Sequence, residues 1–395
     1  MKCVALLFLI CGSLATPVED EALQEFVYGN HKFTAAVYKE ILQTGKDNFV
    51  VSPLSAEIVL ALTNEGARGL TASELVSGLS LPTTRQKTQR ALQSFLPSLK
   101  KYDTKLKLLS ANKIYVGKGL KIAEDFGYIA NTIYDSGVEN VDFERSTHAA
   151  GVINKWVEDN TNDKIRNLIK PGDINEATRM VLVNALYFSG VWLYPFDSYA
   201  TSKRNFFRTK DNAVEVDTML QVETFNYHES KTLNAKFLEL PYQGSDIAMV
   251  IVLPIEKDGL SQLEQNLEQL LVPQSYTPQR VKVELPRFTI ESETKFVPIL
   301  QKLGISKLFS DEADLSGLSS TDKGLYVSNV LQKAFINVTE SGTEAAAATS
   351  VGVALLSAPI APRPIVEFKA DHPFIYYLKD KQTGVVLFFG RYKGQ

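Results

Sequence analysis

The sequence contains very little cysteine, and its two cysteines, Cys3 and Cys11, both lie close to the N-terminus. If that terminus is removed as a signal peptide, the remaining chain has no thiol group. Disulfide bonds, thiol catalysis and cysteine-based metal sites are then excluded. A chain of 395 residues does not need disulfides, because the fraction of surface that folding buries rises with chain length.

Signatures of catalysis are also missing. The four histidines, His31, His148, His228 and His372, show no H-x-x-x-H spacing, so no metal site is predicted. Neither a G-x-S-x-G elbow nor a G-x-x-x-x-G-K-[ST] loop occurs, which argues against an α/β-hydrolase and against nucleotide binding. We therefore predict that the protein is not an enzyme and that it holds no metal or cofactor.

Long hydrophobic runs are absent except at the N-terminus. Residues 1–15 have a positively charged start, an apolar run at 4–10 and a small-residue end, which is typical of a secretory signal peptide cut after Ala15. A buried N-terminal helix is the alternative interpretation. The run is too short to span a bilayer, so we expect a soluble, secreted, extracellular protein without a membrane partner. The formal net charge of −3 gives no indication of nucleic-acid binding.

The remaining chain predicts a mixture of helices and strands. Residues 53–66 form a predicted helix, with Ser52 as N-cap and proline at the first helical position. Residues 180–188 are apolar on both alternating faces except at Asn184, which indicates a central strand with one amide in a buried polar network. No repeat or linker interrupts the chain, so we predict one α+β domain at 16–395.

Further elements follow from periodicity and from turn residues. The T-x-x-E spacing of Thr71 and Glu74 predicts a capping box that opens a short helix ending near Gly78. Other helices are predicted at 21–42, 83–99, 123–134, 149–163, 259–271 and 294–303. Strands are predicted at 48–51, 111–116, 236–240, 247–253, 280–285, 325–338, 374–378 and 385–390.

A local excess of basic residues follows residue 84 in this otherwise acidic protein. A heparin-like polyanion, such as a glycosaminoglycan, could bind there. The alternative is a solvated helix face with a lysine-rich connection, because clustering in sequence need not be clustering in space. The candidate residues for this site are Arg85, Lys87, Arg90, Lys100 and Lys101.

Residues 340–364 do not favour one secondary structure. The S-x-x-E spacing of Ser341 and Glu344, followed by four alanines, favours a helix. A period-2 row of small residues that runs from Thr343 to Val353 favours a strand entering a tight slot. Three prolines near the end favour an exposed loop. Such a segment suits a conformational switch.

Several motifs, in their order and spacing, resemble the serpin family over essentially the whole chain after the signal peptide. The resemblance implies the serpin fold, with three β-sheets, eight to nine helices and an exposed reactive-centre loop at about 340–364. It also implies the known serpin mechanism, in which a protease attacks the loop and the loop then inserts into the sheet. The motifs are 48–55 (NFVVSPLS), 183–192 (VNALYFSGVW), 240–242 (LPY), 285–288 (LPRF), 342–349 (GTEAAAAT), 371–374 (DHPF) and 389–391 (FGR).

The family's hinge matches a row of small residues here. The hinge must insert into the sheet before water hydrolyses the acyl-enzyme. Small, uncharged side chains at the alternate positions that face into the protein therefore suit an inhibitor. In the family, the residue before the cleaved bond is usually the seventeenth when the residue at the position of Glu340 is counted as the first. This places the bond at Leu356-Ser357. Leu355-Leu356 and Ala354-Leu355 remain alternatives. The hinge residues are Gly342, Thr343, Glu344, Ala345, Ala346, Ala347, Ala348 and Thr349.

The resemblance also assigns two supporting sites in the central sheet. Ser52, Ser55 and Asn184 match the family's shutter, the group of polar residues where the central sheet parts. Gln332 stands there in place of the family's usual histidine. Trp192, Arg287 and Glu340 match the family's breach, the region at the top of the central sheet. An ion pair between Arg287 and Glu340 is expected there.

The single N-x-[ST] sequon is a separate candidate site. Its acceptor would be Asn337, at the end of a predicted strand, so glycosylation is possible there unless strand burial blocks it.

These residues together predict a monomeric serine protease inhibitor that acts as a suicide substrate. A leucine at Leu356 suits an apolar specificity pocket, so the expected partner is a chymotrypsin-like protease, or one similar to elastase or cathepsin G, held in a covalent complex. The alternative is a non-inhibitory serpin with a carrier, chaperone or storage role.

Overall fold

The computed structural model describes residues 21–99, 106–319, 324–343 and 364–395. Several predicted features lie outside these residues, namely the signal peptide at 1–15, Lys100 and Lys101, the hinge residues 344–349, and the bond between Leu356 and Ser357. The described chain contains no helix that is long and apolar enough to cross a membrane.

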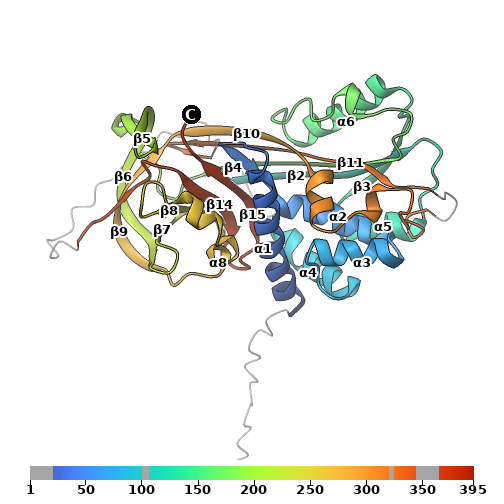
Figure 1. The fold of residues 1–395 in the computed structure, drawn as a ribbon, viewed down its shortest axis with the longest axis horizontal. Coiled ribbons are helices and arrows are strands. Elements are labelled where there is room, and N and C mark those ends of the chain that lie inside the picture. Colours follow the sequence, from blue (N-terminus) through green and yellow to red (C-terminus); the bar gives the residue numbers. More distant parts are fainter. Residues whose placement is uncertain (1–20, 100–105, 320–323, 344–363) are drawn as a thin grey trace, which may run out of the picture.

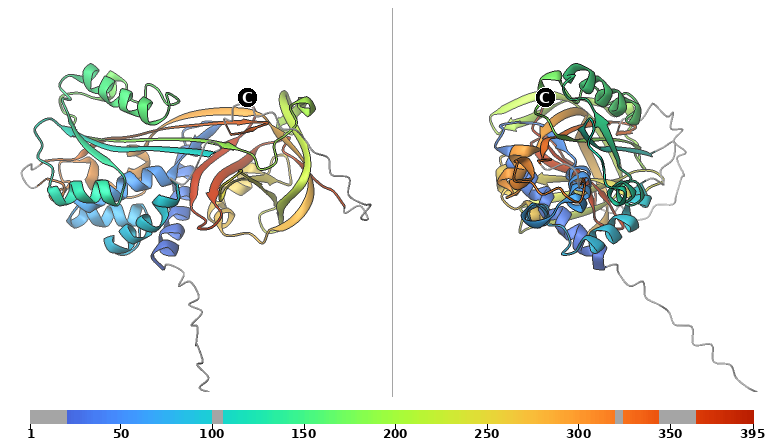
Figure 2. Two further views of the ribbon diagram at one scale, coloured as in Figure 1. Left: turned by 180° about the vertical axis from the view of Figure 1, so that it is seen from behind. Right: turned by 90° about the vertical axis from the view of Figure 1, so that its right-hand side faces the viewer.

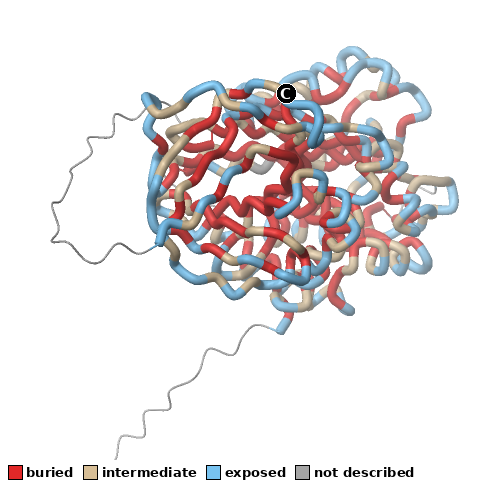
Figure 3. The backbone as a smooth tube through the Cα atoms, turned by 60° about the vertical axis from the view of Figure 1, so that its left-hand side comes forward, coloured by how far each residue is buried: buried red, intermediate tan, exposed pale blue. Residues whose placement is uncertain are grey.

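The helices cover the two faces of a long sheet unequally, as Figure 1 shows and Figure 2 confirms from behind. On one face lies α6 (Ser146–Asn160) with the chain that follows it. The other face is covered by α1 (Glu21–Leu42), α2 (Pro53–Gly66), α3 (Gly69–Gly78), α4 (Arg85–Leu99) and α5 (Glu124–Thr132). Figure 3 shows the buried residues forming a continuous interior, with exposed segments at the periphery.

A six-stranded sheet forms the centre of the molecule. Its two middle strands, β4 and β11, pair in parallel from Met180 opposite Val327 to Tyr187 opposite Phe335. Beyond that point a short strand, β12, lies between them and pairs antiparallel with both. The strand order is β10 (Phe288–Lys295), β11 (Val327–Thr339), β12 (Gly342–Thr343), β4 (Met180–Val191), β2 (Leu106–Gly117) and β3 (Gly137–Val141).

A nine-stranded sheet forms the other end of the molecule. The resemblance implied three sheets, but in the described chain the 19-residue strand β6 pairs with β5, β7 and β9 and so joins two of them by continuous hydrogen bonding. The strands are β1 (Phe49–Val51), β5 (Ser202–Thr209), β6 (Asn212–Ser230), β7 (Ala235–Pro241), β8 (Ile247–Pro254), β9 (Thr277–Pro286), β13 (Val366–Lys369), β14 (Phe374–Asp380) and β15 (Val386–Tyr392).

Helix α2 forms as the sequence predicted. Ser52 is the N-cap residue, its hydroxyl oxygen accepts a hydrogen bond from the Ser55 amide, and Pro53 occupies the first helical position. All 14 residues of this helix are buried, because it lies between the two sheets. The buried strand around Asn184 is also confirmed, since nine consecutive residues of β4 from Met180 are buried.

Two helix predictions were wrong in detail. The capping box at Thr71 does not open α3, which begins at Gly69. The Glu74 carboxylate instead accepts hydrogen bonds of 2.8 Å from the amides of Ser306 and Lys307, at the start of a short 3₁₀ turn. The helix predicted at 259–271 is divided into α7 (Leu260–Glu264) and α8 (Leu267–Leu271), because Asn266 has a non-helical backbone.

The remaining described elements are short. Helix α9 (Phe296–Lys302) follows β10 directly. Three 3₁₀ turns lie at η1 (Pro171–Asp173), η2 (Ser198–Ala200) and η3 (Lys307–Phe309).

Candidate functional site

The site lies where β4 and β11 part. The chain leaves β11 at Thr339, turns through Glu340 and Ser341, and returns as β12 between the two strands. The amide of Trp192 donates a hydrogen bond of 3.0 Å to the Ser341 carbonyl, and the Trp192 indole N–H donates one of 2.9 Å to the Thr339 carbonyl. The segment after β4 therefore holds this turn in place.

Gly342 is the residue that enters the sheet. Its φ of +151° belongs to the region that L side chains rarely adopt, and an added Cβ would lie 2.0 Å from the Gly190 carbonyl oxygen. That oxygen belongs to the backbone of β4 and cannot move aside cheaply. Only glycine therefore fits at this position when β12 is in the sheet.

Thr343 follows and is fully buried. Its hydroxyl group lies 2.6 Å from the hydroxyl group of Tyr242, so the polar group that it brings into the sheet is satisfied. The Tyr242 ring stacks on Trp192, with 4.5 Å between centroids and 18° between planes. Burial raises the pKa of Tyr242 well above its ordinary value, which keeps the phenol neutral. The slot thus accepts a small side chain that carries one hydroxyl.

The expected ion pair between Arg287 and Glu340 is present. The Arg287 Nη1 atom lies 3.6 Å from Glu340 Oε1, and the same oxygen accepts a hydrogen bond of 2.8 Å from the Thr201 hydroxyl. Arg287 also pairs with Asp217 at 3.2 Å. Because the guanidinium group is half exposed, the pair with Glu340 contributes at most about 1 kcal/mol and serves mainly to orient the turn.

The four residues that resemble the shutter lie together where the paired part of β4 and β11 meets the start of α2. The Gln332 side chain accepts a hydrogen bond from the Ser52 amide and donates one to the Ser52 carbonyl, each of 2.8 Å. Gln332 also donates to the Asn184 side-chain oxygen at 2.5 Å, and Asn184 donates to the Ser55 hydroxyl. The Ser52 hydroxyl donates to the Leu387 carbonyl at 2.6 Å, which ties this group to β15.

A fifth member of this network, Asn112, was not predicted from the sequence. Its side-chain oxygen accepts hydrogen bonds from Asn184 at 2.5 Å and from the Ser55 hydroxyl at 3.0 Å. The register explains the grouping, because Asn112, Asn184 and Gln332 lie directly opposite one another on β2, β4 and β11. A buried amide in the neighbouring predicted strand was the only available signal.

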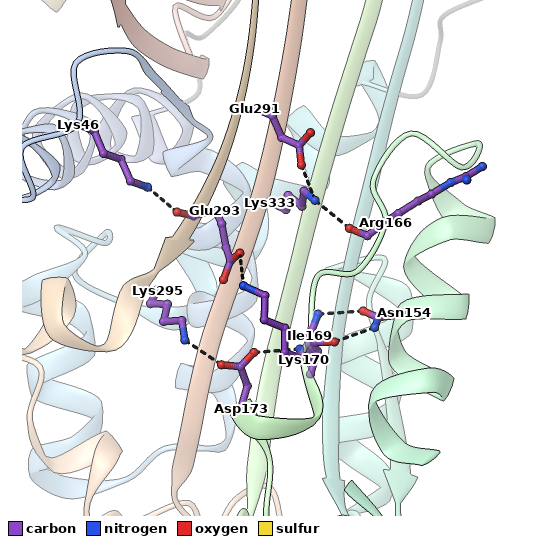
Figure 4. Close-up of polar contacts among 10 residues, drawn as sticks. All are labelled: Lys46, Asn154, Arg166, Ile169, Lys170, Asp173, Glu291, Glu293, Lys295 and Lys333. Carbon is purple, nitrogen blue, oxygen red and sulfur yellow. Dashed lines mark hydrogen bonds and ion pairs between the residues drawn. The ribbon is translucent and has the colours of Figure 1, made fainter. Parts of the chain in front are cut away.

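The chain that follows α6 crosses the sheet and contacts β10 and β11, which the sequence also did not reveal (Figure 4). Lys170 pairs with Glu293 at 3.3 Å, and Asp173 pairs with Lys295 at 2.8 Å. Lys333 donates a hydrogen bond of 2.8 Å to the Arg166 carbonyl. The Asn154 side chain on α6 bonds both the amide and the carbonyl of Ile169, which fixes the start of this crossover.

The predicted polyanion site is only partly described. Lys87 pairs with Glu21 at 3.0 Å and with Glu25 at 2.7 Å, so two carboxylates offset its charge. The Arg85 guanidinium group donates a hydrogen bond of 2.5 Å to the Ala67 carbonyl. The two carboxylates reduce the positive potential around Lys87, whereas the hydrogen bond leaves the charge of Arg85 in place. Arg90 also lies on α4.

Asn337, the predicted glycosylation residue, is half buried on β11. Its side-chain oxygen accepts a hydrogen bond of 2.8 Å from the Thr289 hydroxyl on β10.

The described ranges contain no group of three or more His, Cys, Asp or Glu residues that could hold a metal ion.

The geometry defines a class of protein whose central sheet is parted at one end by a short strand, β12, that lies between two of its strands. Comparison with known proteins agrees. The family model described as "Serpin (serine protease inhibitor)" matches residues 28–393. The chain belongs to the serpin family and has its α+β fold.

Insect serpins are among the relatives of this chain. Antichymotrypsin-2 of Bombyx mori is 38% identical over 370 residues, which cover 92% of this chain and 96% of that protein. Antitrypsin of Bombyx mori is 37% identical, with 92% of each chain covered. The crystal structure of Serpin48, a highly specific serpin of Tenebrio molitor, matches with a TM-score of 0.86 and 44% identity, covering 94% of this chain and 98% of that one.

Proposed function

We propose that the protein is a secreted, monomeric serpin that inhibits a chymotrypsin-like serine protease as a suicide substrate. The observation that carries this proposal is β12, because Gly342 and Thr343 already form a strand between β4 and β11. After Glu344 the sequence continues with four alanines and Thr349, so it can extend the same strand. Relatives named as inhibitors of chymotrypsin and of trypsin support the assignment to protease inhibition.

The covalent step takes place at the Leu356 carbonyl. The protease serine hydroxyl adds to this carbon, the bond to the Ser357 nitrogen breaks, and the departing amine takes up the proton that the serine lost. The product is an ester between the protease and Leu356. Insertion of the hinge then carries the attached protease away before water can hydrolyse the ester.

Insertion requires β4 and β11 to separate along residues 180–187 and 327–335, which are now paired. The hydrogen bond between Gln332 and Asn184 crosses this line and must break. We assign to Ser52, Ser55, Asn112, Asn184 and Gln332 the role of a shutter that keeps the sheet closed until cleavage. Trp192, Arg287 and Glu340 act at the breach, where insertion begins.

The test is to mix the protein with chymotrypsin and to separate the products on a denaturing gel. We expect an SDS-stable complex, and we expect the released C-terminal peptide to begin at Ser357. Elastase and trypsin run beside it define the target class, since Leu356 suits an apolar pocket and not a basic-specific one. A peptide that begins at Leu356 or Leu355 would move the reactive bond to one of the alternative registers.

A cleaved chain without any stable complex would overturn the inhibitory proposal. The carrier alternative would be supported if, in addition, a bound small molecule were found and cleavage of the loop did not raise the melting temperature. N-terminal sequencing of the protein released by expressing cells tests secretion, for which we expect a start at Thr16. Salt-sensitive retention on heparin tests the polyanion site on α4.

A further inference from the structure

A cavity of about 330 Å³ lies where the end of α1 meets β10 and α9, away from the parted strands. Its apolar lining comes from Ile41 on α1 and from Pro298 and Ile299 on α9. Lys46 reaches it from the turn after α1, and the ion pair of 2.9 Å between Glu40 and Lys302 spans α1 and α9 at its edge. An apolar lining with a few fixed polar groups is typical of small-molecule sites.

The charges around this cavity are matched by opposite charges, with one exception. Glu40 pairs with Lys302, and the two charged groups contributed by β10 pair with the crossover, Glu293 with Lys170 and Lys295 with Asp173 (Figure 4). Lys46 has no carboxylate within 4.0 Å in the described part of the chain. Its ammonium group donates a single hydrogen bond of 2.7 Å, to the Glu293 backbone carbonyl.

The position of Lys46 is fixed by its backbone. Arg391 donates hydrogen bonds of 2.6 Å to the Lys46 carbonyl and of 2.9 Å to the Asp47 carbonyl. Arg391 is itself held by the carboxylate of Glu264 at 2.7 Å. Burial lowers the pKa of Lys46, and the nearby Glu293 carboxylate offsets this effect only in part. An ammonium has three donors, so two are left for a ligand.

We propose that this cavity binds a small amphipathic carboxylate, with its charged group on the Lys46 ammonium and its hydrocarbon chain against Ile41, Pro298 and Ile299. A single negative charge fits because only one cation is unmatched. A doubly charged phosphate would also face the nearby carboxylates of Glu40 and Glu293, which disfavour it. The volume lies at the small end of ligand pockets, which suits a short or medium chain.

The probe is sodium octanoate, titrated into the full-length protein and followed by calorimetry. We expect saturable binding of one octanoate per chain. Lys46→Met, which keeps an unbranched side chain of similar length but removes its charge, should weaken binding at least about tenfold, because a charge-assisted hydrogen bond is lost. Octan-1-ol, with the same chain and no charge, should bind the wild-type protein at least about tenfold more weakly than octanoate for the same reason.

Two variants keep the test decisive. Lys39→Met makes the same substitution at an exposed position of α1 and should leave the affinity unchanged. Gln43→Trp places a large side chain at an exposed position of the cavity lining and should abolish binding without altering Lys46. If Lys46→Met fails to fold, Gln43→Trp decides the question alone. Absence of saturable binding to the wild-type protein, or equal affinity in Gln43→Trp, would overturn the proposal.

Discussion

The two ends of the contact between β4 and β11 are built in opposite ways. Along residues 180–187 and 327–335 the strands pair directly, and a network of five polar side chains fastens them to α2. At the other end Gly342 and Thr343 of β12 lie between the same strands. Thr343 contacts Tyr242, whose ring stacks on Trp192. One sheet thus has a closed part and a parted end. In the proposed mechanism, strand insertion would start at the parted end, and the closed part would have to open for it to proceed.

The largest expected effect comes from a charge at the parted end. Thr343→Arg places a cation where the present side chain is fully buried, so β12 cannot remain in the sheet and insertion cannot start there. We expect chymotrypsin to cleave the variant as a substrate, with complex formation reduced at least about a hundredfold, since burying an unpaired charge costs several kcal/mol. The measurement is the fraction of SDS-stable complex on a gel.

Thr343→Val is the matched control, because it keeps the shape and removes only the hydroxyl group that meets Tyr242. It should still form the complex. Undiminished complex formation by Thr343→Arg would show that this position need not enter the sheet.

A second prediction concerns the closed part. Asn184→Ala removes the side chain that bonds Ser55, Asn112 and Gln332, and leaves buried partners unsatisfied. We expect the active form to lose about 3 kcal/mol of stability, because each unsatisfied buried group costs about 1–3 kcal/mol. The measurement is the melting temperature of the uncleaved protein. Asn337→Ala, on the same sheet but half buried with one partner, should cost less than about 1 kcal/mol.

A third prediction concerns Glu57 on α2, beneath the closed part. Burial raises its pKa to about 8, and its Oε2 atom accepts a hydrogen bond of 2.9 Å from Asn30, whereas Oε1 has no partner in the described chain. Because the folded pKa lies above the unfolded value, stability falls as the pH rises from about 4.5 towards 8. Between pH 5 and pH 7 the loss should be about 2 kcal/mol, since each pH unit in this window contributes at most about 1.4 kcal/mol.

Glu57→Gln should remove this part of the pH dependence, so that the variant exceeds the wild-type protein in melting temperature at pH 7 by more than it does at pH 5. Glu223→Gln, at an exposed position of β6, should follow the wild-type curve. If Glu57→Gln shows the wild-type pH dependence, the buried carboxyl group does not control the stability of this helix.

The smallest expected effect concerns the crossover in Figure 4, which spans the closed part. Lys170→Gln removes the exposed ion pair with Glu293, so the crossover should move aside more readily during insertion. We expect the insertion rate, measured by stopped-flow fluorescence with chymotrypsin, to rise no more than about threefold, because exposed pairs contribute little. High salt should produce a similar rise in the wild-type protein and less of one in the variant. A slower rate in Lys170→Gln would contradict this role.

Local features of the site were accessible from the sequence. The cap at Ser52, the proline that follows it and the apolar strand around Asn184 depend on neighbouring residues, so their patterns predicted α2 and β4 correctly. The strands β3, β5, β6, β10 and β13 were not predicted from the sequence. Two further features that it did not predict join distant segments. Asn112 meets Asn184 only through strand pairing, and Glu74 caps a turn more than 200 residues away instead of its own helix.

The sequence by itself determined which residues can enter the sheet. Gly342 and Thr343 are small, and this property of the residues holds in any environment. The tertiary structure decided where they enter and how they are received, because Tyr242, Trp192 and the parted strands come together only when segments about 100 to 150 residues apart in the sequence pack against one another. It also decided that Lys46 has no carboxylate within 4.0 Å among the described residues, since Glu40 and Glu293 are engaged by other lysines that the fold brings to them. Small size is a local property, whereas a slot or an unmatched charge exists only between segments that have folded together.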